Sequence, residues 1–162
     1  MNPHEKGWEM VSKYEAVAEQ VYDIFSRGAA DELDTVFAKD FVEHQELPGV
    51  EGKGVDAVKQ FTQVWRSAFP DARFEMLGIV SEGDTCCVRV RMTGTHSGEF
   101  MGIPATGKKF DIEAYDWVRF NKDGKVKEHW GVGEDLKMMT QLGAIPEQAG
   151  PIDLTQAERT RT

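Results

Sequence analysis

The sequence contains little cysteine and an excess of acidic over basic residues. Its two cysteines are adjacent, at Cys86 and Cys87, among 162 residues. Neighbouring side chains on a strand point to opposite faces, so this pair predicts neither a mutual disulfide nor a metal clamp, and we interpret both as packing residues. Nineteen Lys and Arg against 28 Asp and Glu give a net charge of −9. That charge argues against nucleic acid as a partner, because phosphate contacts require clustered cations.

Long apolar runs are also missing. No run approaches the ~20 residues that a membrane span needs, and the opening MNPHEKGWEM has no apolar core of the kind found in signal peptides. We therefore expect a cytoplasmic protein that makes no membrane contact. The four histidines, at positions 4, 44, 96 and 129, show no His-x-His or His-x-x-x-His spacing. Because nucleotide-loop and Gly-x-Ser-x-Gly motifs are absent too, we expect neither a metal nor a cofactor.

Three helices are expected in the first half of the chain, which has the length of one domain. Apolar residues recur at 3, 4, 7, 8 and 11 residues along positions 14–25, and Gly28 follows as a stop. A short helix follows over residues 31–37, and a longer one spans residues 55–69, where Pro70 ends it.

The second half of the chain is predicted to be a sheet. Residues 73–95 contain two strands that turn at residues 82–84, and residues 109–132 contain two more that turn at residues 121–124. Residues 40–46 form a brief additional strand in this interpretation. The pattern predicts an α+β fold in which helices cover one face of a four-stranded antiparallel sheet. If the sheet curves, the space beneath the helices can remain an open pocket.

Several motifs occur in a fixed order along residues 14–143. They are DFVEH (40–44), AFPD (68–71), EGD (82–84), GTHSGEFMGIPATGKKF (94–110), RFNKDGKVKEHW (119–130) and QLG (141–143). With these motifs the sequence resembles the SnoaL-like polyketide and ester cyclases of the nuclear transport factor 2-like superfamily. The resemblance implies a cone-shaped fold with N-terminal helices on a curved antiparallel sheet that encloses a pocket. We expect a single domain at residues 1–145 and a tail at residues 146–162, because the end of the chain is too polar and too often interrupted by Pro and Gly to pack as a core element.

Asp116 and His129 are the strongest candidates for chemistry. A four-residue turn would put them directly opposite each other, whereas a two-residue turn pairs Asp116 with Gly131 and leaves the two residues diagonal. In both registers they share a face that is otherwise largely apolar. A carboxylate beside an imidazole in such a place can tune the histidine for proton transfer, so we predict His129 as general acid or base and Asp116 as the group that orients it. The alternative is an ion pair that only satisfies two polar groups.

The family resemblance raises a difficulty at position 131. The aromatic polyketide cyclases use an acid/base aspartate on the last strand, and its place in this chain is Gly131. The place of Asp116 in those cyclases is commonly a histidine. The resemblance therefore implies either that this chain has redistributed the acid/base pair or that it is not a cyclase.

Five further residues are candidate substrate contacts, each with a purely structural alternative. His44 matches the family histidine of DFVxH, and His96 lies in the glycine-rich loop near the expected pocket mouth, although either can be a hydrogen-bonded structural histidine. Trp65 and Phe69 are pocket wall or simple packing residues. Glu134 matches a family acidic position, but an acid at a helix start is also explained by the helix dipole.

We therefore expect a small lipophilic or carbonyl-bearing molecule to bind in the pocket, with cyclase, isomerase or hydrolase chemistry. The alternative is a non-catalytic module for small-molecule binding or dimerisation, which the glycine at position 131 favours. A homodimer is expected through the sheet face that carries Trp117 and Trp130, because this face points away from the pocket and the family commonly pairs.

Overall fold

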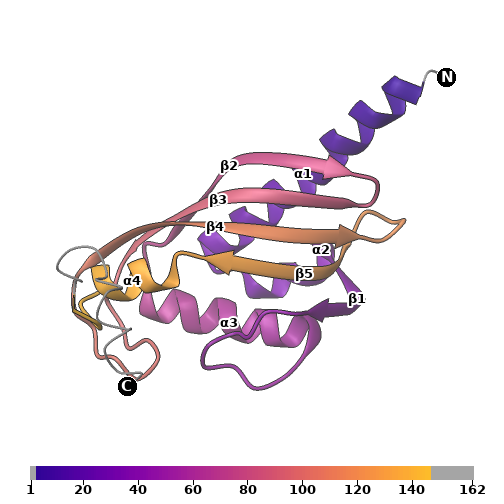
Figure 1. The fold of residues 1–162 in the computed structure, drawn as a ribbon. Helices are drawn as coiled ribbons and strands as arrows, with labels where there is room; N and C mark the ends of the chain where they lie inside the picture. The colour runs from indigo at the N-terminus through magenta and orange to yellow at the C-terminus, as the bar shows by residue number, and fades with distance from the viewer. Residues whose placement is uncertain (1–2, 147–162) are drawn as a thin grey trace, which may run out of the picture.

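The computed structural model of the protein describes the backbone of residues 3–146 and the side chains of residues 13–146. Figure 1 shows the elements in chain order. They are α1 (Pro3–Arg27), η1 (Ala30–Glu32), α2 (Leu33–Val36), β1 (Phe37–Glu43), α3 (Gly54–Ala68), β2 (Arg73–Glu82), β3 (Thr85–Thr95), β4 (Lys109–Phe120), β5 (Val126–Gly133) and α4 (Asp135–Gln141). The predicted tail at residues 146–162 lies outside the described residues from position 147 on.

The described strands form one sheet in the order β1-β5-β4-β3-β2. Strands β2 to β5 are antiparallel neighbours, as the sequence predicted. The prediction of four strands was wrong, because β1 joins the edge of the sheet parallel to β5, with Glu43 opposite His129. Parallel strands need a long connection, here the whole segment from α3 to β4, so no local turn could reveal this pairing.

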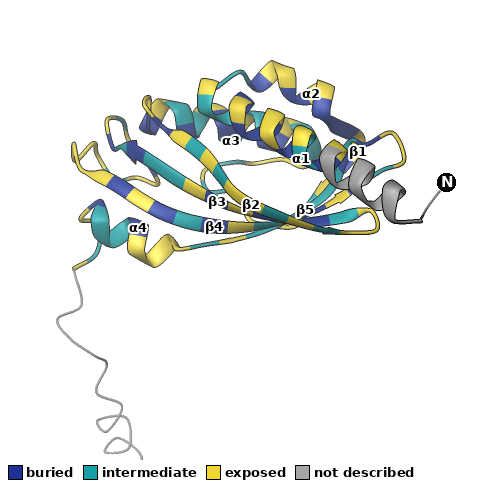
Figure 2. Ribbon diagram, turned by 90° about the horizontal axis from the view of Figure 1, so that it is seen from above, coloured by how far each residue is buried: buried dark blue, intermediate teal, exposed yellow. Residues whose placement is uncertain are grey.

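Helices α1, α2 and α3 cover one face of the curved, unclosed sheet, and α4 lies at the end of the sheet (Figure 2). On α3 the buried positions recur at helical spacing, and these are Ala57, Val58, Thr62, Trp65 and Ala68. On β4 burial alternates with the two-residue period of a strand, and the buried set is Phe110, Ile112, Ala114, Val118 and Phe120. The predicted α+β arrangement is therefore confirmed. Among the described helices, none combines the length and the apolar composition that crossing a membrane requires.

The glycine-rich connection between β3 and β4 folds back onto the end of α3. The backbone N–H groups of Ser97 and Gly98 both donate to the carbonyl oxygen of Ala68, at 2.9 and 3.0 Å. A side chain at position 98 would collide with the backbone carbonyl of Ser67, so glycine is required for this approach. The loop thereby satisfies a carbonyl at the C-terminus of α3.

The same loop inserts an aromatic side chain into the core. The ring of Phe100 is 4% exposed and packs edge-on against Trp65 and Phe69, with centroid distances of 5.6 and 5.0 Å. A tight turn at Met101 and Gly102, with positive φ at both residues, returns the chain to Ile103. The length of this connection therefore serves packing between α3 and the sheet.

Candidate active site

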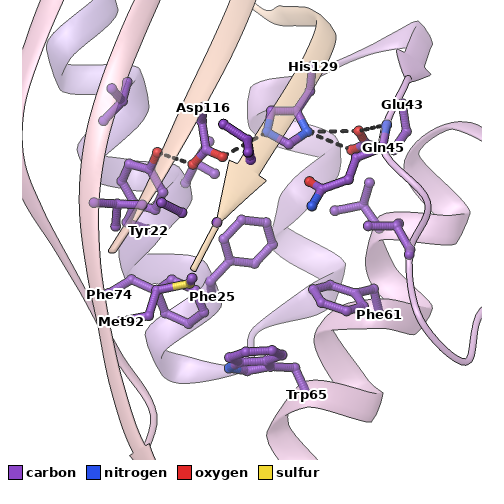
Figure 3. Close-up of a pocket in the computed structure, with 18 of the residues that line it drawn as sticks. Tyr22, Phe25, Glu43, Gln45, Phe61, Trp65, Phe74, Met92, Asp116 and His129 are labelled. Carbon is purple, nitrogen blue, oxygen red and sulfur yellow. Dashed lines mark hydrogen bonds and ion pairs between the residues drawn. The ribbon is translucent and has the colours of Figure 1, made fainter. Parts of the chain in front are cut away.

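Four polar side chains from four elements form a hydrogen-bonded chain beneath the helices (Figure 3). The hydroxyl of Tyr22, on α1, donates to Asp116 Oδ2 on β4 at 2.6 Å. Asp116 Oδ1 lies 3.1 Å from Nε2 of His129 on β5. The other ring nitrogen of His129, Nδ1, lies 2.8 and 2.9 Å from the two carboxylate oxygens of Glu43 on β1. The order of the chain is therefore Tyr22, Asp116, His129, Glu43.

The register of β4 and β5 brings the central pair together. Val118 lies opposite His129 and Asp116 lies opposite Gly131, which is the second of the two registers considered from the sequence. The loop itself spans residues 121–125 and is therefore longer than a two-residue turn. A register shift between Arg119 and Phe120 compensates for the extra residues, so Val118 still pairs with His129. Asp116 and His129 are thus diagonal neighbours on one face, as both registers required.

His129 is held as a cation. Ionised carboxylates only accept hydrogen bonds, so both ring nitrogens of His129 must carry a proton to donate to Asp116 and Glu43. Burial by itself lowers the pKa of His129, but the hydrogen bonds and charges of Asp116 and Glu43 outweigh burial and raise this pKa to about 9. The ring is therefore an imidazolium at neutral pH, flanked by two carboxylates.

Asp116 receives one donor on each oxygen, from His129 and from Tyr22. Burial and the adjacent Asp116 carboxylate both raise the pKa of Tyr22 above its ordinary value, so its hydroxyl stays protonated and donates. Each carboxylate oxygen has two lone-pair directions, and each of these oxygens therefore keeps one for a further partner. Asp116 can accept a proton from a molecule placed beside it.

The Asp116 carboxylate lies over the glycine of the neighbouring strand. A Cβ atom at Gly131 would be 3.1 Å from Asp116 Oδ1. The family resemblance places the acid/base aspartate of the cyclases at position 131, and in this chain the carboxylate next to that position belongs to Asp116, the paired residue on β4.

The chain of polar groups borders a cavity of about 320 Å³ between the sheet and the helices. Its apolar wall includes the aromatic side chains of Phe25, Phe61, Trp65, Phe74 and Phe100. Its charged lining residues are Glu43, Glu46, Asp116, His129 and Asp135, and no lining residue in the described part of the chain is Lys or Arg. No group of three or more His, Cys, Asp or Glu among the described residues is arranged to hold a metal ion.

Four of the five predicted contact residues do not line the cavity, and two of these four are the histidines. His44 is on the opposite face of the sheet, where its ring stacks on Trp130 with a centroid distance of 4.1 Å and its Nε2 lies 3.1 Å from Glu128 Oε2. His96 is fully buried within the glycine-rich loop, where Nδ1 lies 3.1 Å from the hydroxyl of Thr106. The predicted placement of His44 toward the pocket and of His96 at its mouth was therefore wrong.

The other three predicted contacts lie at different depths. Trp65 is in the cavity wall, whereas Phe69 is fully buried behind it, with a ring-centroid distance of 4.7 Å. Glu134 lies outside the cavity lining, just before α4. Its carboxylate accepts the backbone N–H of Glu113 at 2.9 Å and pairs with Lys137 at 2.7 Å, a structural arrangement.

Sequence reasoning missed Tyr22, Glu43 and Gln45, all of which line the cavity. The signal for Glu43 and Gln45 was present, because side chains two residues apart on a strand share a face and Phe41 is buried. That parity puts His44 on the other face. Tyr22 carried no distinguishing signal, because it belongs to the apolar stripe of α1.

Comparison with known proteins places this geometry in a family context. Residues 15–142 match the family model of SnoaL-like polyketide cyclases. The chain is 27% identical over 131 residues to aklanonic acid methyl ester cyclase DauD of Streptomyces sp. (strain C5), covering 76% of this chain and 78% of that protein. It is 27% identical over 120 residues to nogalonic acid methyl ester cyclase of Streptomyces nogalater, covering 74% and 89%. Among solved structures, TsrD from Streptomyces laurentii superposes with a TM-score of 0.75 at 25% identity, covering 83% of this chain and 97% of TsrD.

Proposed function

The chain belongs to the SnoaL-like polyketide cyclase family and has its nuclear transport factor 2-like fold, and on this premise we propose that it closes a ring in a small carbonyl-bearing substrate by acid/base catalysis. The substrate binds in the cavity between helices and sheet. Asp116 exchanges the proton with the substrate, and His129 holds the Asp116 carboxylate in place.

One observation carries this proposal: a hydrogen-bonded row of ionisable groups borders a cavity that is otherwise mainly apolar. Apolar walls suit a lipophilic molecule, and a carboxylate in a poorly hydrated place interacts strongly with a nearby acidic C–H group. His129, held between Asp116 and Glu43, supplies a fixed positive charge beside the reacting carboxylate.

The geometry favours a division of roles different from the one expected from the sequence. His129 has both ring nitrogens engaged by carboxylates, so it has no free position for accepting a proton. Asp116 keeps one free lone-pair direction on each oxygen. In the proposed reaction Asp116 therefore exchanges the proton with the substrate, while His129 and Tyr22 hold its carboxylate in place.

The proposed reaction is an isomerisation. Asp116 takes a proton from a carbon next to a carbonyl group, and the C–H electron pair passes to the carbonyl oxygen to give an enolate. The enolate carbon attacks a second carbonyl carbon of the same molecule, which forms the ring C–C bond. The resulting alkoxide takes the proton back from Asp116, so the product has the same mass as the substrate.

The non-catalytic alternative rested on the glycine at position 131. Because the Asp116 carboxylate lies over this glycine, the chain has a carboxylate near the family position after all. This favours the enzyme proposal over a binding module.

The proposal is tested with aklanonic acid methyl ester and nogalonic acid methyl ester, the compounds in the names of the two cyclase relatives. Chromatography with mass detection should show a new isomer of unchanged mass. We expect Asp116→Asn to lower the rate on the order of a hundredfold or more, whereas Asp123→Asn, in the exposed turn, should leave the rate unchanged. Recovery of both esters bound but unaltered would support the non-catalytic module instead.

We also propose a homodimer through the outer face of the sheet. Tyr115, Trp117 and Val132 on this face are 47%, 51% and 67% exposed, an amount of apolar surface that association would cover. Light scattering at micromolar concentration should give the dimer mass for the natural protein and the monomer mass for Trp117→Glu. A monomer of the natural protein would contradict the proposal.

A further inference from the structure

Three residues form a row across the sheet at the level of Asp116. Glu43 of β1 lies opposite His129, so the next position on the same face brings Gln45 beside Gly131. On its other side Gly131 is paired with Asp116. The row is therefore Gln45, Gly131, Asp116, and its central member has no side chain.

The glycine allows the two outer side chains to approach each other. A Cβ atom at Gly131 would collide with the side-chain oxygen of Gln45 and would lie 3.1 Å from Asp116 Oδ1. The φ of Gly131 is not positive, so the backbone does not require glycine here. A larger residue at position 131 would fill the space above the strand that the side chains of Gln45 and Asp116 now use.

The backbone of Gln45 is fixed by the same network that holds the imidazolium. Its N–H donates to Glu43 Oε1 at 3.0 Å, and Glu43 holds His129. The loop after β1 is anchored there by the N–H of His44, which donates to the backbone carbonyl of His129 at 3.0 Å. Figure 3 shows the amide end of Gln45 reaching into the cavity.

The amide of Gln45 lies above Gly131 near the carboxylate, where its oxygen is the atom nearest the glycine and its N–H group is available as a donor. Its side chain makes no hydrogen bond to any residue that the structure describes, whereas Tyr22 and His129 already give their protons to carboxylates. The remaining charged groups of the lining are acceptors, and none is Lys or Arg. A negative charge that develops on a substrate oxygen near Asp116 thus has the Gln45 amide as its nearby uncommitted donor.

We propose that Gln45 binds the substrate carbonyl oxygen and stabilises the enolate that forms when Asp116 removes the neighbouring proton. This inference rests on the proposed function. As the C–H bond breaks, the proton moves to Asp116 and the electron pair moves to the oxygen that the Gln45 N–H group contacts. The hydrogen bond strengthens with the charge, so it favours the transition state over the bound substrate.

The test uses 4-nitrophenolate as a stable mimic of the enolate and nitrobenzene as a neutral molecule of similar shape. The protein carries Asp116→Asn, which mimics the neutral acid present after proton transfer. Calorimetric titration at one pH compares this protein with the same protein that also carries Gln45→Leu. We expect Gln45→Leu to weaken the binding of 4-nitrophenolate at least tenfold, which is the range for losing a hydrogen bond to a charged group. The binding of nitrobenzene should weaken by less than about threefold.

A matched control and a second variant keep the result interpretable. Gln63→Leu, on the exposed side of α3, should change neither affinity. Gly131→Ala keeps every polar group but displaces the Gln45 amide, so it should also weaken 4-nitrophenolate selectively. In a Gln45→Ala background the same glycine change should have less than about a twofold effect, because the amide is no longer there to displace and the contact with the side chain at position 116, at 3.1 Å, needs only a small shift.

The outcomes separate this inference from the proposed function. If 4-nitrophenolate and nitrobenzene bind and Gln45→Leu changes both by less than about threefold, the role of Gln45 is overturned while the binding cavity stands. If neither molecule binds to the protein that retains Gln45, the proposed cavity function fails and this inference fails with it.

Discussion

The positions of the groups around Asp116 depend on the charge of a single residue, His129. A histidine buried without partners prefers the neutral form, but here two acceptors occupy both ring nitrogens. The effect of the two carboxylates is larger than the effect of burial, and they raise the pKa of His129 to about 9. The positive charge of His129 attracts the Asp116 and Glu43 carboxylates, which lie on either side of the ring.

The first prediction concerns this titration. Nitrogen NMR of the imidazole should show His129 protonated on both nitrogens at neutral pH, with a pKa of about 9. Asp116→Asn and Glu43→Gln should each move the pKa of His129 down, because each removes one of the two charges that raise it. A neutral ring that titrates near its ordinary value in the natural protein would contradict the assignment.

The same shift predicts a pH dependence of stability. The pKa of His129 is raised in the folded protein, so its stabilising effect is fully present below about pH 6.5 and is lost as the pH rises through about 9. The difference in melting temperature between the natural protein and His129→Gln should therefore be larger at about pH 6 than at about pH 10. An equal difference at both pH values would contradict this linkage.

Residue-level prediction from the sequence succeeded where the periodicity was unambiguous. Asp116 and His129 lie on long strands of one hairpin, so both candidate registers put them on one face. It failed for His44, because the match to the family histidine was followed although the alternation from Phe41 puts Glu43, and not His44, on the buried face. It did not find Gln45, whose significance depends on the missing side chain of Gly131.

Among the elements, the connection between β3 and β4 acts as a clamp, by which we mean that it holds the C-terminal end of α3 in place against the sheet. Its backbone N–H groups bond the last turn of the helix, and its Phe100 ring fills the space beside Trp65. The helix thereby keeps Trp65 in the cavity wall. A loop that is long for a strand connection is thus part of the support of the site.

We predict a loss of stability when a substitution pushes this connection away from the end of α3. Gly98→Ala should lower the free energy of unfolding by about 2 kcal/mol or more, because the new methyl group meets the backbone carbonyl of Ser67. Gly78→Ala, where a Cβ atom meets nothing within 4 Å, is the matched control and should change it by less than about 0.5 kcal/mol. Equal effects in urea unfolding would contradict the clamp.

The elements themselves could be predicted from local pattern. Each of the helices α1 and α3 buries one stripe of apolar residues, and β4 buries every second residue. The spacing of apolar residues in the sequence shows both patterns directly. The parallel pairing of β1 with β5 could not be predicted, because it joins segments far apart in the chain without a turn between them.

Acidic groups outnumber basic ones in the whole molecule and in the cavity lining, and we expect this charge to select the ligand. The net charge is −9, and the cavity is lined by four carboxylates, one histidine and no Lys or Arg among the described residues. Carboxylates repel an anion and also penalise its loss of hydration. A neutral ester should be preferred over the corresponding acid.

The corresponding prediction compares methyl 2-naphthoate with 2-naphthoate. The ester should bind at least about tenfold more tightly at neutral pH and low salt. Replacing the two exposed acids of the lining, by Glu46→Gln together with Asp135→Asn, should strengthen binding of the acid and leave binding of the ester unchanged. An unchanged affinity for the acid would show that the lining charge does not select the ligand.

We propose that Asp116 removes a proton from a carbon next to a carbonyl group of a molecule in the cavity, and this step can be measured by itself. It is tested most directly with α-tetralone, an aromatic ketone, in deuterated water, by following loss of the proton signal beside the carbonyl in NMR spectra. We expect exchange to be faster with the natural protein than without it, and to fall on the order of a hundredfold or more with Asp116→Asn. Exchange at the same rate with both proteins, while α-tetralone is shown to bind, would contradict it.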